Sequence, residues 1–128
     1  STSNVWIYNS DTSYSQNLVV TPGALVTTSL INVIGGLAST YGVPVAPHDC
    51  TGPVVLTVGT HLGVTYPNIE LQEMVRAFYY GWYQEMVTVL PHYENGYLTP
   101  PSTPGLGTQL QPGINKRADA VVRWSKVG

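Results

Sequence analysis

The chain has 128 residues, and only 9% of them are charged, whereas an ordinary soluble domain has roughly 25%. This length allows one compact domain with its own core. Five Lys and Arg against seven Asp and Glu leave no basic surface for a phosphate backbone, so we expect no nucleic-acid partner. The single cysteine, Cys50, cannot form an internal disulfide, and no run resembles a secretion signal. We therefore expect a cytoplasmic location.

The charged residues are unevenly spread. None lies between Asp11 and Asp49, and none between Asp49 and Glu70. The apolar stretch at 24–38 is interrupted by polar residues and a glycine pair, and it is shorter than the roughly 20 apolar residues of a membrane span, so we expect no membrane association. Neutral, turn-bounded apolar runs are typical of parallel strands covered by helices on both faces. The first half of the chain therefore indicates the inside of an α/β body.

The first part of the chain predicts short strands around one helix. Runs rich in β-branched and aromatic residues predict the strands. A Thr-Pro-Gly turn followed by a mixed apolar pattern predicts the helix. In chain order, the expected elements are a strand at 4–8, a strand at 17–20, a turn at 21–23, a helix from Leu25 to about Tyr41, and a strand at 43–46.

The second part predicts two more helices and then an irregular region. Pro53 suits the first turn of a helix, where its missing N–H costs nothing. Apolar residues three or four apart predict an amphipathic helix, which Gly81 weakens locally. In chain order, we expect a helix at 54–64, a strand at 69–72, one helix from Met74 to Val89, a packed coil from Pro91 with a tight turn at Asn95-Gly96, and a tail at 118–125 that fits either helix or strand.

Alternating strands and helices imply right-handed crossovers and a parallel sheet. The predicted fold class is therefore α/β, either an open sheet or part of a β/α barrel. His48 and Asp49 follow directly on a predicted strand, and the carboxyl ends of such strands hold ligands and catalytic groups in these folds. Imidazole is a natural general base near neutral pH. The alternative is a structural His-Asp pair that shapes the turn before the next helix.

Two carboxylates, Glu70 and Glu73, lie near the end of the next predicted strand. Either one could meet His48 there and act as an acid or a hydrogen-bond partner. The alternative is that they place favourable negative charge in the first turn of the following helix. No cluster has metal-ligand spacing and no glycine-rich loop has a phosphate-binding context, so the residues predict neither a metal nor a cofactor site. Of the other candidates, we expect His61 and His92 to be structural or solvated and Cys50 to be a small buried filler.

Three stretches of the sequence resemble the C-terminal third of the enolase superfamily, in its mandelate racemase, muconate lactonizing and acid-sugar dehydratase branch. The strings PHDCTGP and PGLG, in that order, are the most specific part of this resemblance. The resemblance divides the chain into an unmatched segment, 1–16, and a partial β/α-barrel segment with a capping tail, 17–128. The three stretches are 41–54 (YGVPVAPHDCTGPV), 67–82 (PNIELQEMVRAFYYGW) and 95–110 (NGYLTPPSTPGLGTQL).

The resemblance implies the C-terminal part of a (β/α)8 barrel, about strands six to eight with their crossover helices, and an irregular capping tail. It implies that His48, after the seventh strand, is a general base that moves a proton next to a carboxylate, with Glu73 as its partner at the eighth. It also implies that Mg2+ holds the enediolate in the full-length relatives. The metal ligands of these relatives lie on earlier strands, so we expect no metal for this chain alone. The carboxylate that would orient His48 is missing around 20–22.

Three functional hypotheses follow from these observations. The first is a fragment of a Mg-dependent acid-sugar dehydratase or racemase, inactive as an isolated chain, whose low charge marks a surface covered by a complementary chain or by a second copy. The second is a non-catalytic small α/β domain that oligomerises. The third is a small-molecule binding module that uses the nine Tyr and three Trp residues.

Overall fold

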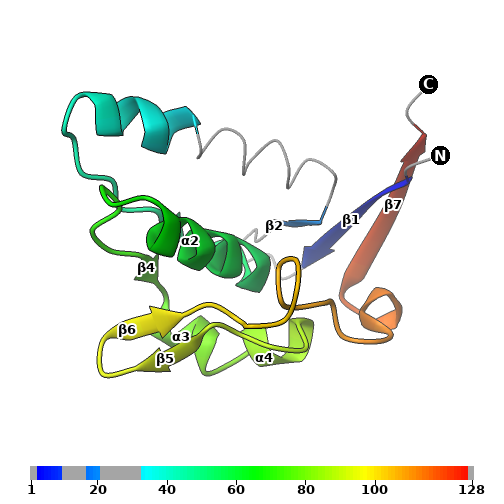
Figure 1. Ribbon diagram of the computed structural model, residues 1–128. Coiled ribbons are helices and arrows are strands. Elements are labelled where there is room, and N and C mark those ends of the chain that lie inside the picture. The colour runs from blue at the N-terminus through cyan, green and yellow to red at the C-terminus, as the bar shows by residue number, and fades with distance from the viewer. Residues whose placement is uncertain (1–2, 10–16, 21–32, 127–128) are drawn as a thin grey trace.

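The computed structural model describes residues 3–9, 17–20 and 33–126 (Figure 1). The predicted turn at 21–23 and the first part of the predicted helix, up to residue 32, lie outside the described residues. The elements in chain order are β1 (Ser3–Asn9), β2 (Asn17–Val20), a helical segment at 33–40, β3 (His48–Asp49), α2 (Pro53–Thr65), β4 (Glu73–Met74), α3 (Arg76–Tyr79), α4 (Tyr83–Met86), β5 (His92–Glu94), β6 (Tyr97–Thr99), the 3-10 turn η1 (Ile114–Lys116) and β7 (Ala120–Lys126).

An antiparallel sheet in the order β2-β1-β7 lies at one end of the molecule (Figure 1). Ser3 of β1 is opposite Lys126 of β7, and Val5 is opposite Val20 of β2. The strands predicted at 4–8 and 17–20 are confirmed, and the tail is a strand. The expectation that 17–20 belongs to a parallel sheet is wrong. Residues 10–16 separate β1 from β2, which is too short a connection for parallel pairing, so the two strands pair antiparallel.

The parallel, α/β part of the fold consists of β3, α2 and β4. His48 is opposite Glu73 in a parallel register, and an isolated parallel bridge joins Val45 to Ile69. The predicted order of strand, helix and parallel strand is confirmed. The bounds predicted for the two strands, 43–46 and 69–72, are wrong, because β3 and β4 lie at 48–49 and 73–74 and only the bridge of Val45 with Ile69 falls in the predicted ranges. Pro44 and Pro47 have no N–H to donate to a neighbouring strand, which prevents a regular ladder at 43–46.

The central helix α2 agrees closely with its prediction at 54–64. Proline occupies its first turn, as expected, and Leu56 has no exposed surface. The buried hydroxyls of Thr57 and Thr60 donate to the carbonyls of Pro53 and Leu56, at 2.7 and 2.8 Å. Because these polar groups are satisfied within the helix, α2 can be buried on most of its surface.

The single amphipathic helix predicted from Met74 to Val89 is wrong, because the structure has two short helices, α3 and α4, in its place. Gly81 lies between them, and a Cβ at this position would come within 2.6 Å of the Ala77 carbonyl oxygen. Aromatic packing then fixes the turn, since the rings of Trp82 and Tyr83 meet edge to face at a centroid distance of 4.5 Å. The core between α2, α4 and the tail contains Val54, Met86, Val87 and Ile114.

A β-hairpin, β5–β6, follows α4. Asn95 and Gly96 both have positive φ, 50° and 86°, as a type I′ turn requires, so the predicted tight turn is confirmed. The expected coil from Pro91 therefore begins with two paired strands, and the irregular part follows from Pro100 to Gly113.

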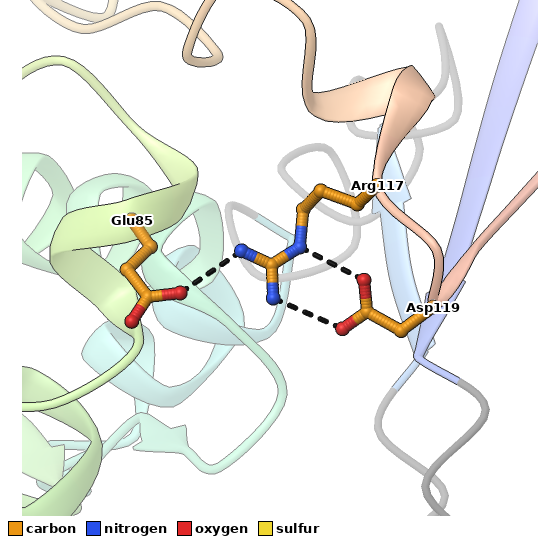
Figure 2. Close-up of polar contacts among 3 residues, drawn as sticks. All are labelled: Glu85, Arg117 and Asp119. Carbon is orange, nitrogen blue, oxygen red and sulfur yellow. Dashed lines mark hydrogen bonds and ion pairs between the residues drawn. The ribbon is translucent and has the colours of Figure 1, made fainter.

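The tail is fastened to α4 by one guanidinium group (Figure 2). Arg117 donates from Nη1 to Glu85 of α4 at 2.9 Å, and its Nε and Nη2 donate to the two carboxylate oxygens of Asp119 at 2.9 and 3.0 Å. This fork holds the start of β7 next to the helical part of the fold.

Candidate active site

His48 and Glu73 lie side by side at the ends of the two paired parallel strands. Their parallel register places the imidazole Nε2 3.5 Å from Glu73 Oε2. The two side chains are 60% and 50% exposed, so their ion pair contributes little to folding stability. An exposed imidazole beside a carboxylate is able to accept and return a proton. The predicted meeting of His48 with a carboxylate of the next strand is thus present in the structure.

Asp49 points away from this pair, since successive side chains of a strand face opposite sides. It has no exposed surface, and its Oδ2 accepts a hydrogen bond from the Tyr83 hydroxyl at 2.9 Å. Its Oδ1 accepts the backbone N–H groups of Thr51 at 3.4 Å and Gly52 at 3.3 Å. Asp49 therefore shapes the turn before α2, as the structural alternative predicted for it.

Burial alters the protonation of both members of the Asp49–Tyr83 pair. Loss of solvent raises the pKa of Asp49, and the hydrogen bonds from Tyr83 and the backbone offset part of this rise. Burial, and then the neighbouring Asp49 carboxylate, raise the pKa of Tyr83, which therefore remains a hydroxyl donor. The pair is suited to holding a fixed geometry.

The remaining histidine and cysteine candidates have no described contact with the His48–Glu73 pair. His61 Nε2 lies 3.0 Å from the Leu106 carbonyl oxygen, a structural contact as predicted. His92 is exposed and lies 3.6 Å from Glu94, also as predicted. The expectation that Cys50 is a buried filler is wrong. It is exposed, because Asp49 takes the inward-facing position of the strand.

Glu70, the other carboxylate considered, is exposed and lies beside a different cavity. Its backbone N–H donates to the Val45 carbonyl oxygen at 3.2 Å. The cavity, about 300 Å³, is also lined by Gln72 and Tyr97. Of the two carboxylates, the one in contact with His48 is therefore Glu73.

Gln72 is a residue of the site that sequence reasoning missed. Its Nε2 donates to the carbonyl oxygens of Pro47 at 3.0 Å and Glu73 at 2.7 Å, and so joins the two strands that carry the site. It also lines a cavity of about 200 Å³ together with His48 and Val45. Gly59 is an indication in the sequence of where Gln72 packs, because only glycine at this position of α2 leaves room for the Gln72 side chain. That indication is visible only once the two segments are brought together.

The described residues do not form a magnesium site. Within 33–122, where side chains are described, no group of three or more His, Cys, Asp or Glu residues could hold a metal ion. Magnesium needs several oxygen ligands in near-octahedral geometry. The carboxylate of Asp49 is buried and already accepts three hydrogen bonds, which leaves Glu73 as the carboxylate nearest to His48. Nor is any helix of the described part of the chain long and apolar enough to cross a membrane.

The comparison with protein families settles the affiliation of this chain. Residues 29–114 match the family described as "Enolase C-terminal domain-like". The chain belongs to this family. The match includes His48, Glu73, Gln72 and Tyr83, and the resemblance to the C-terminal part of the enolase superfamily is confirmed.

Solved enolase-superfamily structures resemble the chain in fold as well. An enolase of the mandelate racemase subgroup from Agrobacterium tumefaciens is 44% identical with a TM-score of 0.66, and the match covers 76% of this chain and 26% of that one. An enolase protein from Sargasso Sea environmental sequences is 45% identical with a TM-score of 0.64, and the match covers 74% of this chain and 25% of that one. The matched part of this chain therefore has the fold of the corresponding quarter of these enolases.

Two D-galactonate dehydratases are among the curated proteins that are similar to this chain. The one from Ralstonia nicotianae is 31% identical over 86 residues, and the one from Ralstonia pickettii is 30% identical over 86 residues. In both cases the match covers 63% of this chain and 22% of the dehydratase. This enolase-family chain thus spans about a quarter of the length of its relatives.

Proposed function

We propose that this chain is the C-terminal part of an acid-sugar dehydratase or racemase, and that His48 transfers the proton next to the substrate carboxylate. The supporting observation is the 3.5 Å contact of His48 with Glu73 at two paired strand ends. The His48 imidazole accepts the proton on the ring nitrogen that does not face Glu73, and Glu73, which lies next to Nε2, stabilises the imidazolium that forms. The two D-galactonate dehydratases support the acid-sugar substrate class.

The reaction also needs positive charge that this chain does not supply. Proton removal next to a carboxylate produces an oxyanion, which must be held by strong positive charge in the transition state. The residues described around His48 do not fit a magnesium ion, so we assign to this chain the proton transfer alone. The positive charge, and the Mg2+ expected in the full-length relatives, belong to the part of the (β/α)8 barrel that strands one to five would form. We therefore propose that the chain alone is inactive, and that it works in the cytoplasm with a complementary chain.

Reconstitution tests this proposal. The chain alone should not turn over a panel of acid sugars in the presence of Mg2+. Addition of the complementary N-terminal part of one of the D-galactonate dehydratases should produce turnover, which His48→Ala should abolish and Glu73→Gln should reduce. The control is His92→Ala, because His92 has a similar glutamate neighbour but lies on the β5–β6 hairpin and not on β3 or β4. Turnover that survives His48→Ala would contradict the proposed role of His48.

A second candidate function, a non-catalytic domain that oligomerises, is supported by one observation. Val33, Leu37 and Tyr41 lie four residues apart along the helical segment 33–40 and its C-terminal end, and they are 64%, 60% and 77% exposed. We propose that a second copy covers this apolar face when no complementary chain is present. The binding-module hypothesis remains a prediction, which a thermal-shift screen with small molecules would test.

A further inference from the structure

The two consecutive residues of β3 face different environments. His48 is exposed and faces Glu73, whereas Asp49 is fully buried. The backbone between them is short and extended, so a constraint on the Asp49 side chain also constrains the direction in which His48 leaves the strand. What holds Asp49 therefore bears on the geometry of the His48–Glu73 pair.

Asp49 is held from both sides of its carboxylate. The N–H groups of Thr51 and Gly52 hold Oδ1, and both belong to the same turn as Asp49. The Tyr83 hydroxyl holds Oδ2, and it comes from α4, 34 residues further along the chain. Among the described residues, the side chain that hydrogen-bonds this carboxylate from a distant element is that of Tyr83.

Tyr83 is itself fixed in place. It has no exposed surface. Its ring meets Trp82 edge to face at 4.5 Å and lies 5.9 Å from the ring of Phe78. Because the ring has little freedom to move, its hydroxyl is held in a fixed position. The Asp49 carboxylate, which accepts the hydrogen bond of this hydroxyl, is fixed with it.

We propose that Tyr83 is a positioning residue for His48, because its hydrogen bond to Asp49 fixes β3 so that the imidazole faces Glu73. This inference rests on the proposed function, in which His48 is the proton-transferring group. Tyr83 touches neither reacting atom in this scheme and acts through Asp49. Gln72 acts in the same direction from the other strand, since its Nε2 donates to the Pro47 carbonyl oxygen directly before His48.

The test is NMR of the full 128-residue chain, with the histidine ring signals assigned by His48→Ala. In the unmodified chain, a nuclear Overhauser effect should join the His48 ring protons to the Glu73 side chain. Tyr83→Phe keeps the ring and removes the hydroxyl, so this effect should weaken and the His48 ring signals should shift by more than their line width. The ring signals of His92 should stay in place, because its neighbour Glu94 lies on its own strand.

A matched control separates positioning from a general loss of stability. Tyr79→Phe also removes a hydroxyl with two hydrogen bonds, to the Pro91 carbonyl oxygen at 2.7 Å and from the Tyr93 N–H at 3.1 Å. It should lower the unfolding temperature and leave the His48–Glu73 effect unchanged. If Tyr83→Phe also leaves that effect unchanged, Tyr83 is only structural and the proposal is overturned.

Two further variants show whether Tyr83 acts through Asp49. Asp49→Ala removes the acceptor of the Tyr83 hydrogen bond, so it should displace the His48 signals in the same way, and it replaces Tyr83→Phe as the test if that variant does not fold. Combining both substitutions should add no further displacement, because both break one interaction. Fully additive displacements would overturn the route through Asp49. These NMR measurements need no substrate. Failed reconstitution of activity would therefore contradict the proposed function, whereas an unchanged His48–Glu73 effect in Tyr83→Phe would contradict only the positioning role of Tyr83.

Discussion

Asp49 and Asp119 have pKa values that are displaced in opposite directions by their surroundings. Burial raises the pKa of Asp49 above its ordinary value of 3.8. The Arg117 guanidinium, which donates two hydrogen bonds to Asp119, lowers the pKa of that carboxyl (Figure 2). Both residues therefore make folding stability depend on pH, with opposite signs.

The free energy of unfolding should report the Asp49 effect directly. The folded state binds the Asp49 proton more tightly than the unfolded state, so ionisation of this group costs stability as the pH rises from 3.8 through its raised pKa. The stability of the unmodified chain relative to Asp49→Asn should therefore fall over that range. Urea unfolding at a series of pH values measures the difference.

Asp119→Asn is the control with the opposite sign. The stabilisation by ionised Asp119 is fully present above pH 3.8 and is lost as the pH falls below 3.8 through its lowered pKa. The advantage of the unmodified chain over Asp119→Asn should therefore shrink only in acid, and it should be small because the side chain is 35% exposed. If the difference in free energy of unfolding between the unmodified chain and Asp49→Asn does not change with pH, burial does not raise the pKa of Asp49.

At the level of elements, α2 packs closely against the segment before β4 at a glycine, Gly59. A Cβ at Gly59 would collide with the side chain of Gln72, which is held by its two hydrogen bonds across the strands. At Gly63, one turn further along the same helix, a Cβ would meet Ile69 Cγ2 at 3.7 Å, an ordinary contact. A side chain at position 59 would therefore clash with its surroundings, whereas one at position 63 would not.

Alanine at these two positions should have opposite effects. Gly59→Ala gains about 1 kcal/mol of helix propensity but loses two hydrogen bonds of about 1 kcal/mol each, so it should destabilise by about 1 kcal/mol. Gly63→Ala keeps its surroundings and should stabilise by about 0.5–1 kcal/mol. Urea unfolding followed by circular dichroism measures both. Equal stabilisation by the two substitutions would show that Gln72 is not packed against α2.

Elements that depend on neighbouring residues could be predicted well from the sequence, whereas the partner of Asp49 on a distant element could not. Pro53 marks the start of α2 and Asn95-Gly96 marks the hairpin turn, because each acts on its own backbone. His48 was found because it follows a strand. The bond of Asp49 to Tyr83 was not, because 34 residues separate them and Tyr83 is one of nine tyrosines. The contact of His48 with Glu73 could thus be predicted from the sequence, whereas the contact of Asp49 with Tyr83 could not.

The α3–α4 region shows why a periodic pattern can mislead. Apolar residues between Met74 and Val89 recur at helical spacing, yet the chain turns at Gly81. Periodicity reports which residues are buried on one face, and the aromatic packing of Trp82 and Tyr83 satisfies the same burial with two short helices. The break matters for the site, since it places Tyr83 at the start of α4.

For the molecule as a whole, the apolar face of Val33, Leu37 and Tyr41 predicts self-association. Analytical ultracentrifugation of the isolated chain should give a mass above that of one chain, which is 13.8 kDa. Leu37→Glu places a charge on that face and should restore the mass of a single chain. Tyr97→Glu is the control, because Tyr97 is also an exposed apolar residue, at 77%, but lies on the β5–β6 hairpin. An unmodified chain that is already a monomer would contradict self-association and favour a complementary chain.

The pairing of β1 with β7 has a consequence for the order in which the molecule assembles. Ser3 lies opposite Lys126, so closing this pair encloses nearly the whole chain, whereas β3, α2 and β4 lie within 48–74. The entropy cost of closure grows with the logarithm of loop length and amounts to roughly 4 kcal/mol for a loop of this size. The strands that carry His48 and Glu73 can therefore meet early, before the ends of the chain have found each other.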